Sequence, residues 1–253
     1  MAPPSAGVPS EKGAPVFGKN DAATGTDSTG PLPAGKRCGV TGNPRLGRLF
    51  AGMIALLAGG AVVLQVLLGV ESVQAQGRSA LDGVVLVFSY FTVLTNTLVA
   101  IVAGASALLG ERNGLLTRAG TRAAAAIYIF VVGAIFAALL TGLRETHGLD
   151  RLADDTLHRV VPVLFVLYWL LFVPKGQLRW RDPVAWMLYP LLYVAYSLLY
   201  GALSGRYLYP FGDVSVLGYG RALANGALIL AGFLVLGMIV VAIDRAMAPA
   251  RST

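Results

Sequence analysis

The sequence predicts an all-α fold, a polytopic membrane protein built as a bundle of six transmembrane helices. Hydrophobic residues make up 56% of the 253-residue chain and charged residues only 13%, about half the charged fraction of a soluble domain. Six apolar segments each come near the ~20 residues that a helix needs to cross ~30 Å of hydrocarbon. They cover residues 49–70, 84–109, 123–142, 157–174, 184–204 and 222–243.

The first 46 residues differ from the rest of the chain in composition. They hold seven of the 13 prolines and few large apolar residues. Such a segment cannot bury enough surface to offset its ordering entropy, so we expect residues 1–46 to be a disordered tail. The apolar run that follows is too long for the core of a signal peptide. Residues 47–246 are then the six-helix domain, and 247–253 a short C-terminal tail.

The basic residues are distributed unevenly between the two sides of the predicted membrane. The side that holds both termini carries 14 of the 20 lysines and arginines and a net charge of +8, whereas the other side carries −1. By the positive-inside rule both termini are cytoplasmic, and we expect the protein in the plasma membrane. Topology thus explains the net charge of +7 without nucleic acid. The expected partners are membrane lipids, and the sequence specifies no protein partner.

A polar cluster interrupts the second apolar segment at SYFTVLTN, residues 89–96. In a continuous helix Ser89, Thr92 and Asn96 are spaced i, i+3, i+7 and form one stripe, with Thr95 at its edge. One interpretation is helix packing, because hydroxyls bond back to the i−4 carbonyl and asparagine ties helices together. The other is that the stripe lines a pocket that opens near the outer leaflet.

A second candidate is DDTLHRVVP, residues 154–162. His158 stands at the outer start of the fourth segment, and Pro162 is expected to open the helix there. The alternative is an ordinary interfacial histidine. The Asp154–Asp155 pair nearby leaves a metal site open as a possibility, but two histidines and one cysteine, Cys38, give no metal-binding pattern, and we predict neither a metal nor another cofactor.

Tyrosines form a row on the fifth segment at i, i+4, i+7 and i+11. Buried phenols must form hydrogen bonds, so the row either packs against other helices or lines a cavity, with Tyr193 and Tyr196 as candidate pocket residues. The loop 206–220 contributes Asp213. With both termini inside, Thr92, His158 and Asp213 all lie in the outer half of the membrane.

Several motifs in this order resemble one known family. YFTVLTN, LHRVVP, WLLFVPKG, MLYPLLY and YPFGD followed by GYG are similar to motifs of the bacterial six-helix relatives of the androgen-induced and androgen-dependent TFPI-regulating membrane proteins. The resemblance covers residues 45–246. The chain departs from the pattern at Tyr168, where many bacterial relatives carry aspartate, and at Arg159, where they carry histidine or an aromatic residue.

The resemblance implies a threonine hydrolase of fatty acid esters of hydroxy fatty acids, with Thr92 as the nucleophile and His158 as its partner. A threonine hydroxyl needs a base, and neutral histidine can act as one near pH 7. Asn96 or a tyrosine of the row is a candidate oxyanion donor. Two other classes remain open, a transporter or lipid-binding protein that uses the same polar stripe, and a non-catalytic membrane scaffold.

Overall fold

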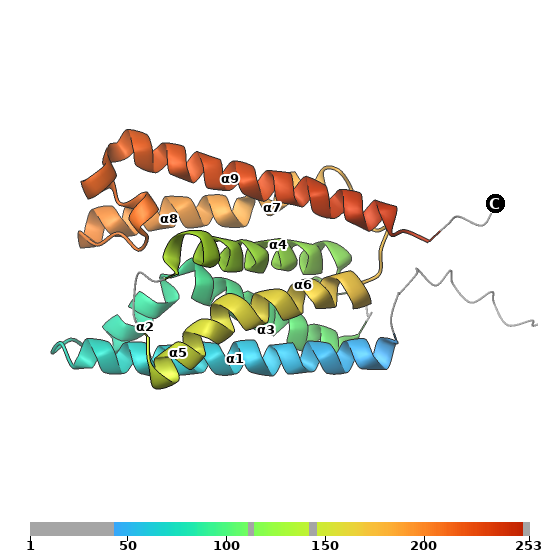
Figure 1. Cartoon of the computed structure of the whole chain (residues 1–253), viewed down its shortest axis with the longest axis horizontal. Helices are drawn as coiled ribbons and strands as arrows, with labels where there is room; N and C mark the ends of the chain where they lie inside the picture. Colours follow the sequence, from blue (N-terminus) through green and yellow to red (C-terminus); the bar gives the residue numbers. More distant parts are fainter. Residues whose placement is uncertain (1–42, 111–113, 142–145, 250–253) are drawn as a thin grey trace, which may run out of the picture. The chain divides into compact units, whose positions relative to one another are not determined.

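The computed structural model describes residues 43–110, 114–141 and 146–249, and the regular structure of these residues is entirely helical (Figure 1). Six segments among them are long and apolar enough to cross a membrane, which confirms the predicted six-helix fold. The predicted tail lies outside the described residues except for its last four positions. The spans are Pro44–Gln74, Phe91–Leu109, Ala119–Leu140, Gly148–Phe172, Asp182–Ser204 and Val214–Ala246.

The helices follow one another with few long connections. In chain order they are α1 (Pro44–Gln74), α2 (Ala80–Phe88), α3 (Phe91–Leu109), α4 (Ala119–Ile135), the π-helical turn η1 (Phe136–Leu140), α5 (Gly148–Asp155), the π-helical turn η2 (Thr156–Val160), α6 (Val161–Phe172), α7 (Asp182–Trp186), α8 (Leu188–Ser204), the 3₁₀ turn η3 (Pro210–Gly212) and α9 (Val214–Ala246).

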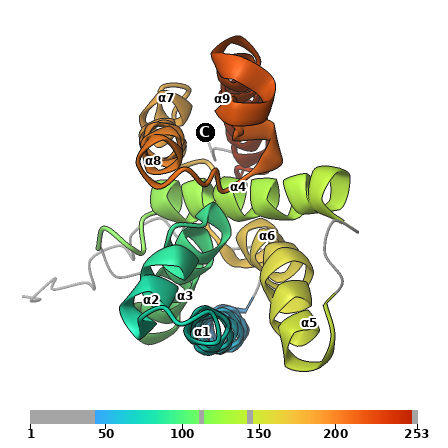
Figure 2. The same cartoon turned by 90° about the vertical axis from the view of Figure 1, so that its left-hand side faces the viewer.

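Helix α4 lies in the middle of the bundle. It packs against α3 and α6 on one side and against α7 and α9 on the other (Figure 2). Ala123, Ala125 and Ile129 on this helix are fully buried. Small side chains let neighbouring helices approach closely, which stabilises packing where lipid supplies no hydrophobic driving force between helices. This central helix carries η1 at its end and so brings Phe136 to the candidate site.

The second predicted span is broken, and the expectation of one continuous helix over 84–109 is wrong at Ser89–Tyr90. Helix α2 ends at Phe88, Tyr90 is extended (φ −81°, ψ 134°), and α3 begins at Phe91. The Ser89 hydroxyl donates to the Val85 carbonyl, and the Tyr193 phenol donates to the Ser89 carbonyl. These side-chain bonds replace part of the helical ladder and stabilise the break.

Two π-helical turns lie side by side at the same end of the bundle. η2 directly precedes α6, whose second residue is Pro162. Pro162 has no N–H to donate to the His158 carbonyl and displaces the preceding turn. A proline-opened helix was expected at this position, and the opening takes the form of a π turn. η1 widens the end of α4 in the same way. Such turns re-aim individual side chains and are frequent at functional sites.

The opposite end of the bundle holds buried charges. Lys175 donates to the carbonyls of Trp169 and Val173 and stands over the Trp169 ring, while Asp244 accepts from the Leu178 N–H. Burial lowers the pKa of Lys175 to about 8, against the opposing charge of Asp244. Arg122 is buried beside the Tyr168 hydroxyl, so Tyr168 belongs to this charged cluster.

Replacing Gly83 with alanine is expected to destabilise the packing of α2 on α1. A Cβ at Gly83 would stand 2.7 Å from the Val70 Cα, whereas one at Gly60 would meet nothing within 4 Å. Both changes raise helix propensity by ~1 kcal/mol, so the difference between them isolates an overpacking cost of about 1–3 kcal/mol. Thermal unfolding in detergent should show a lower midpoint for Gly83→Ala than for Gly60→Ala. Equal midpoints would contradict this packing.

Candidate active site

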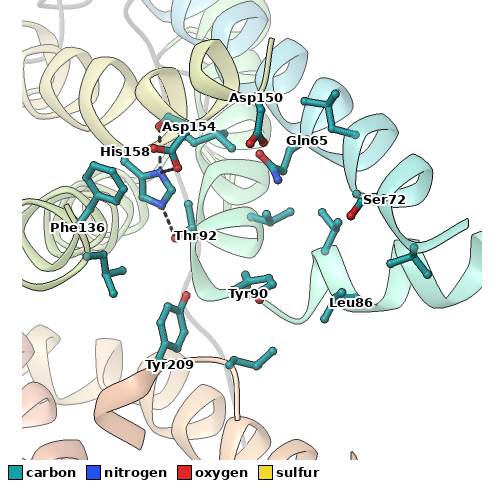
Figure 3. Close-up of a pocket in the computed structure, with 18 of the residues that line it drawn as sticks. Gln65, Ser72, Leu86, Tyr90, Thr92, Phe136, Asp150, Asp154, His158 and Tyr209 are labelled. Carbon is teal, nitrogen blue, oxygen red and sulfur yellow. Dashed lines mark hydrogen bonds and ion pairs between the residues drawn. The ribbon is translucent and has the colours of Figure 1, made fainter. Parts of the chain in front are cut away.

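Thr92 is the second residue of α3, because the helix is interrupted at Ser89–Tyr90 and starts again at Phe91. Its side chain is 8% exposed, and its hydroxyl Oγ1 lies 3.2 Å from Nε2 of His158 (Figure 3). The two residues are 66 positions apart in the chain. His158 lies on the π-helical turn η2, where the helix is opened. The structure therefore brings the two predicted candidates together.

Asp154 stands behind the histidine, one helical turn earlier. The ring nitrogen Nδ1 of His158 lies 3.1 Å from the Asp154 carboxylate oxygen Oδ1 and 3.0 Å from the Asp154 carbonyl oxygen. Two oxygen acceptors at Nδ1 place the proton of a neutral imidazole there. Nε2 then has a free lone pair, which faces the Thr92 hydroxyl. The three side chains form a line from carboxylate to imidazole to hydroxyl.

Aromatic stacking fixes the plane of the imidazole. The rings of Phe136 and His158 are stacked, with centroids 4.2 Å apart and an interplanar angle of 21°. The Arg159 guanidinium lies 5.0 Å from the centroid of the same Phe136 ring and pairs with Asp155. Phe136 comes from η1 and His158 from η2, so both π turns contribute to the orientation of the histidine.

A cavity of about 490 Å³, which we call the chamber, opens beside this line of residues. Thr92, Asp154 and His158 all contribute to its wall. Its volume falls within the range of small-molecule sites. The remaining wall comes mainly from α1, α2, α5, η1 and the loop before η3, and includes both polar and apolar side chains. The polar ones are Gln65, Ser72, Gln76, Asp150 and Arg206.

Tyr209 reaches Thr92 from the loop between α8 and α9. Figure 3 shows its hydroxyl directed toward Thr92. Burial raises the pKa of the Tyr209 phenol, so the hydroxyl keeps its proton and remains a donor. We did not predict Tyr209 or Asp154 as site residues, although the YPFGD motif and the four-residue spacing from Asp154 to His158 were visible signals.

The other polar residues of the SYFTVLTN stretch support the helices around the site. The Asn96 amide donates to the carbonyls of Thr92 and Leu157, which ties α3 to η2 next to His158. Its Nδ2 is thereby committed to backbone acceptors. Ser89 bonds to Tyr196, and Thr95 to Tyr189. Ser89, Thr95 and Asn96 do not line the chamber. Of the expected polar stripe, Thr92 is the residue that contributes to the chamber wall.

Two tyrosines of the row contact the helix interruption at Ser89–Tyr90. Tyr193 donates to the Ser89 carbonyl and Tyr196 pairs with the Ser89 hydroxyl. Tyr193 also lines a smaller cavity next to Thr92.

Asp213 was expected at a pocket. It caps α9, where its carboxylate accepts from the backbone N–H groups of Ser215 and Val216. It starts the last helix because acceptors at this position satisfy its first N–H groups.

In the described part of the chain no three His, Cys, Asp or Glu side chains are grouped closely enough to hold a metal ion. The Asp155 carboxylate pairs with Arg159 and Arg151.

No protein family, curated protein or solved structure matches this chain.

Proposed function

We propose that this six-span membrane protein is a hydrolase of lipid esters that uses Thr92 as nucleophile and His158 as general base. One observation carries the proposal: the alignment of Asp154, His158 and Thr92 at 3.1 and 3.2 Å on the wall of the chamber. A nucleophile within reach of a base that a third group orients is the arrangement of covalent acyl-transfer enzymes, and it recurs on unrelated folds.

Catalysis begins with proton transfer from the Thr92 hydroxyl to Nε2 of His158 as Oγ1 attacks the ester carbonyl. The imidazolium formed is stabilised by the Asp154 carboxylate at Nδ1. His158 then gives the proton to the departing alkoxide, and the alcohol leaves. A water molecule repeats the sequence on the acyl-threonine: it loses a proton to His158, and Thr92 regains one as the acid is released. The sum is ester plus water to acid plus alcohol.

The oxyanion of this reaction forms beside Thr92, where Tyr209 and the start of α3 supply donors. The first N–H groups of a helix have no ordinary helical acceptor and favour nearby negative charge. In α3 the Val93 N–H donates to the Tyr90 carbonyl, so the N–H groups of Phe91 and Thr92 are the candidate donors. The Tyr209 hydroxyl, kept protonated by its burial, is a second donor near the same position. Asn96 supports this arrangement indirectly by holding α3 against η2.

The location of the site favours a lipid substrate. The chamber lies among the ends of membrane-spanning helices and is lined by both apolar and polar side chains. We propose that the protein resides in the plasma membrane with both termini in the cytoplasm, so that the chamber faces the outer leaflet. The motif resemblance to the androgen-induced and androgen-dependent TFPI-regulating proteins implies the same two catalytic residues.

Activity-based labelling tests the proposal directly. A fluorophosphonate probe should label the purified, detergent-solubilised wild type, and peptide mapping should place the adduct on Thr92. Thr92→Ala should lose the label, whereas Thr95→Ala, a hydroxyl three residues further on that bonds Tyr189 instead, should keep it. Label that survives Thr92→Ala would refute the nucleophile. A wild type that neither takes the label nor hydrolyses any ester would favour the transporter or scaffold interpretation.

Replacing Tyr209 with phenylalanine is expected to lower kcat about 10²- to 10³-fold, as the loss of one oxyanion donor does in other enzymes. KM should change little, because the ring and its packing remain. Tyr207→Phe is the matched control: Tyr207 lies in the same loop, packs against Gly201 and lines neither cavity. Steady-state ester hydrolysis measures both. An equal effect of the two changes would refute a role for the Tyr209 hydroxyl.

A further inference from the structure

Thr92 stands on the boundary between two cavities. One is the chamber of about 490 Å³. The other, which we call the slot, measures about 70 Å³ and lies between α4, α8 and α9. Thr92, Leu140 and Tyr209 line both cavities, whereas His158 lines only the chamber. The nucleophile and the oxyanion donor are therefore shared by the two cavities, and the base belongs to one of them.

The two cavities differ in chemistry as well as in size. The chamber carries several amide, hydroxyl and charged side chains from α1, α5 and the loop before η3. Apart from Thr92 and the phenols of Tyr193 and Tyr209, the slot is lined by apolar side chains. Those that define it are Val131, Val132, Ile135, Pro190, Ile229 and Phe233.

The position of His158 decides which part of an ester enters which cavity. The tetrahedral intermediate at Thr92 carries an acyl group and an alkoxy group, which point in different directions. Only the alkoxy oxygen must receive the proton from Nε2 of His158 when its bond to carbon breaks. The alkoxy group therefore faces the chamber, and the acyl group faces the slot. The water that later cleaves the acyl-threonine also enters from the chamber, where His158 can take its proton.

We infer that the substrates are esters of a short, apolar acyl group with a larger amphipathic alcohol. This inference rests on the proposed function. At roughly 10–15 Å³ of such cavity space per water-sized group, the slot takes an acyl chain of about five to seven carbon-sized groups. The chamber is several times larger, and its polar residues suit an alcohol that carries hydroxyl, amide or charged groups.

The test uses the full-length protein in detergent and 4-methylumbelliferyl esters with acyl groups from acetyl to palmitoyl. For wild type we expect the highest kcat/KM between butanoyl and octanoyl. Ile229→Trp fills the slot and should shift the optimum to acetyl or propanoyl, with at least about a 10-fold loss for octanoyl, since one or two lost methylene contacts are worth this much in a pocket. Val194→Trp, also in the slot wall, is a second variant if the first fails to fold.

The complementary variant lies in the chamber. Gln65→Trp narrows it from α1 and should lower kcat/KM for 4-methylumbelliferyl butanoate relative to methyl butanoate, while the preferred acyl length stays the same. The opposite pattern, with Ile229→Trp selecting the alcohol and Gln65→Trp the acyl chain, would overturn the assignment, as would a wild type indifferent to acyl length. If no ester were hydrolysed in a Thr92-dependent way, the proposed hydrolase function would be refuted, and the inference about its substrates with it.

Discussion

Replacing His158 with alanine is expected to lower kcat/KM for ester hydrolysis by about 10³- to 10⁴-fold, because the Thr92 hydroxyl then has no base. The change should also open space beside Thr92, since the histidine forms part of the chamber wall. Free imidazole can enter that space, so added imidazole should restore part of the activity. Initial rates over a range of imidazole concentrations measure the rescue.

Thr92→Ala provides the control for this rescue. It keeps His158 and its contacts to Asp154 but lacks the nucleophile, so imidazole should restore nothing. Near-UV circular dichroism or thermal unfolding should show that both variants keep the wild-type fold. Full activity of His158→Ala without imidazole would exclude the histidine as the base, whatever its distance from Thr92.

Asp154→Asn is expected to lower kcat by about 10²- to 10³-fold with little change in KM. Loss of the carboxylate removes the charge that stabilises the imidazolium and the acceptor that holds the proton on Nδ1. The loss should be smaller than that of His158→Ala, because the carbonyl oxygen of residue 154 still accepts from Nδ1 at 3.0 Å. Steady-state kinetics that separate kcat from KM provide the measurement.

Asp155→Asn is the matched control for this change. Asp155 is adjacent in sequence and carries the same charge, but its carboxylate pairs with Arg159 and Arg151 near the surface. Exposed ion pairs contribute at most about 1 kcal/mol, so hydrolysis should stay within a few-fold of wild type. If the two substitutions had equal effects, Asp154 would act only through the local charge and not through His158.

The motif comparison and the geometry overlap at two residues. Thr92 and His158 were candidates from polar residues in apolar segments and from the family resemblance, and the structure places their side chains in contact. Tyr193 and Tyr196 were candidate cavity residues. Tyr193 does line the slot, and the hydroxyls of both residues also stabilise the interruption before α3. Each phenol needed a partner, but the sequence could not show that the partner was the backbone and side chain of Ser89.

The sequence by itself determined the six-helix fold. A membrane span depends on the length of an apolar run and on where charges flank it, and both can be read along the chain. Polar residues in apolar segments are costly and therefore conspicuous; they marked the stripe that contains Thr92 and the segment start that contains His158, and the family resemblance singled out these two residues.

Only the tertiary structure decided how these residues could work. The break at Ser89–Tyr90 depends on a phenol from α8, 104 positions away, and the orientation of His158 on a ring from η1. Tyr209 and the two cavities arise where the loop before η3 meets α3. These features depend on contacts between segments that lie far apart in the sequence, so no local pattern in the sequence specifies them.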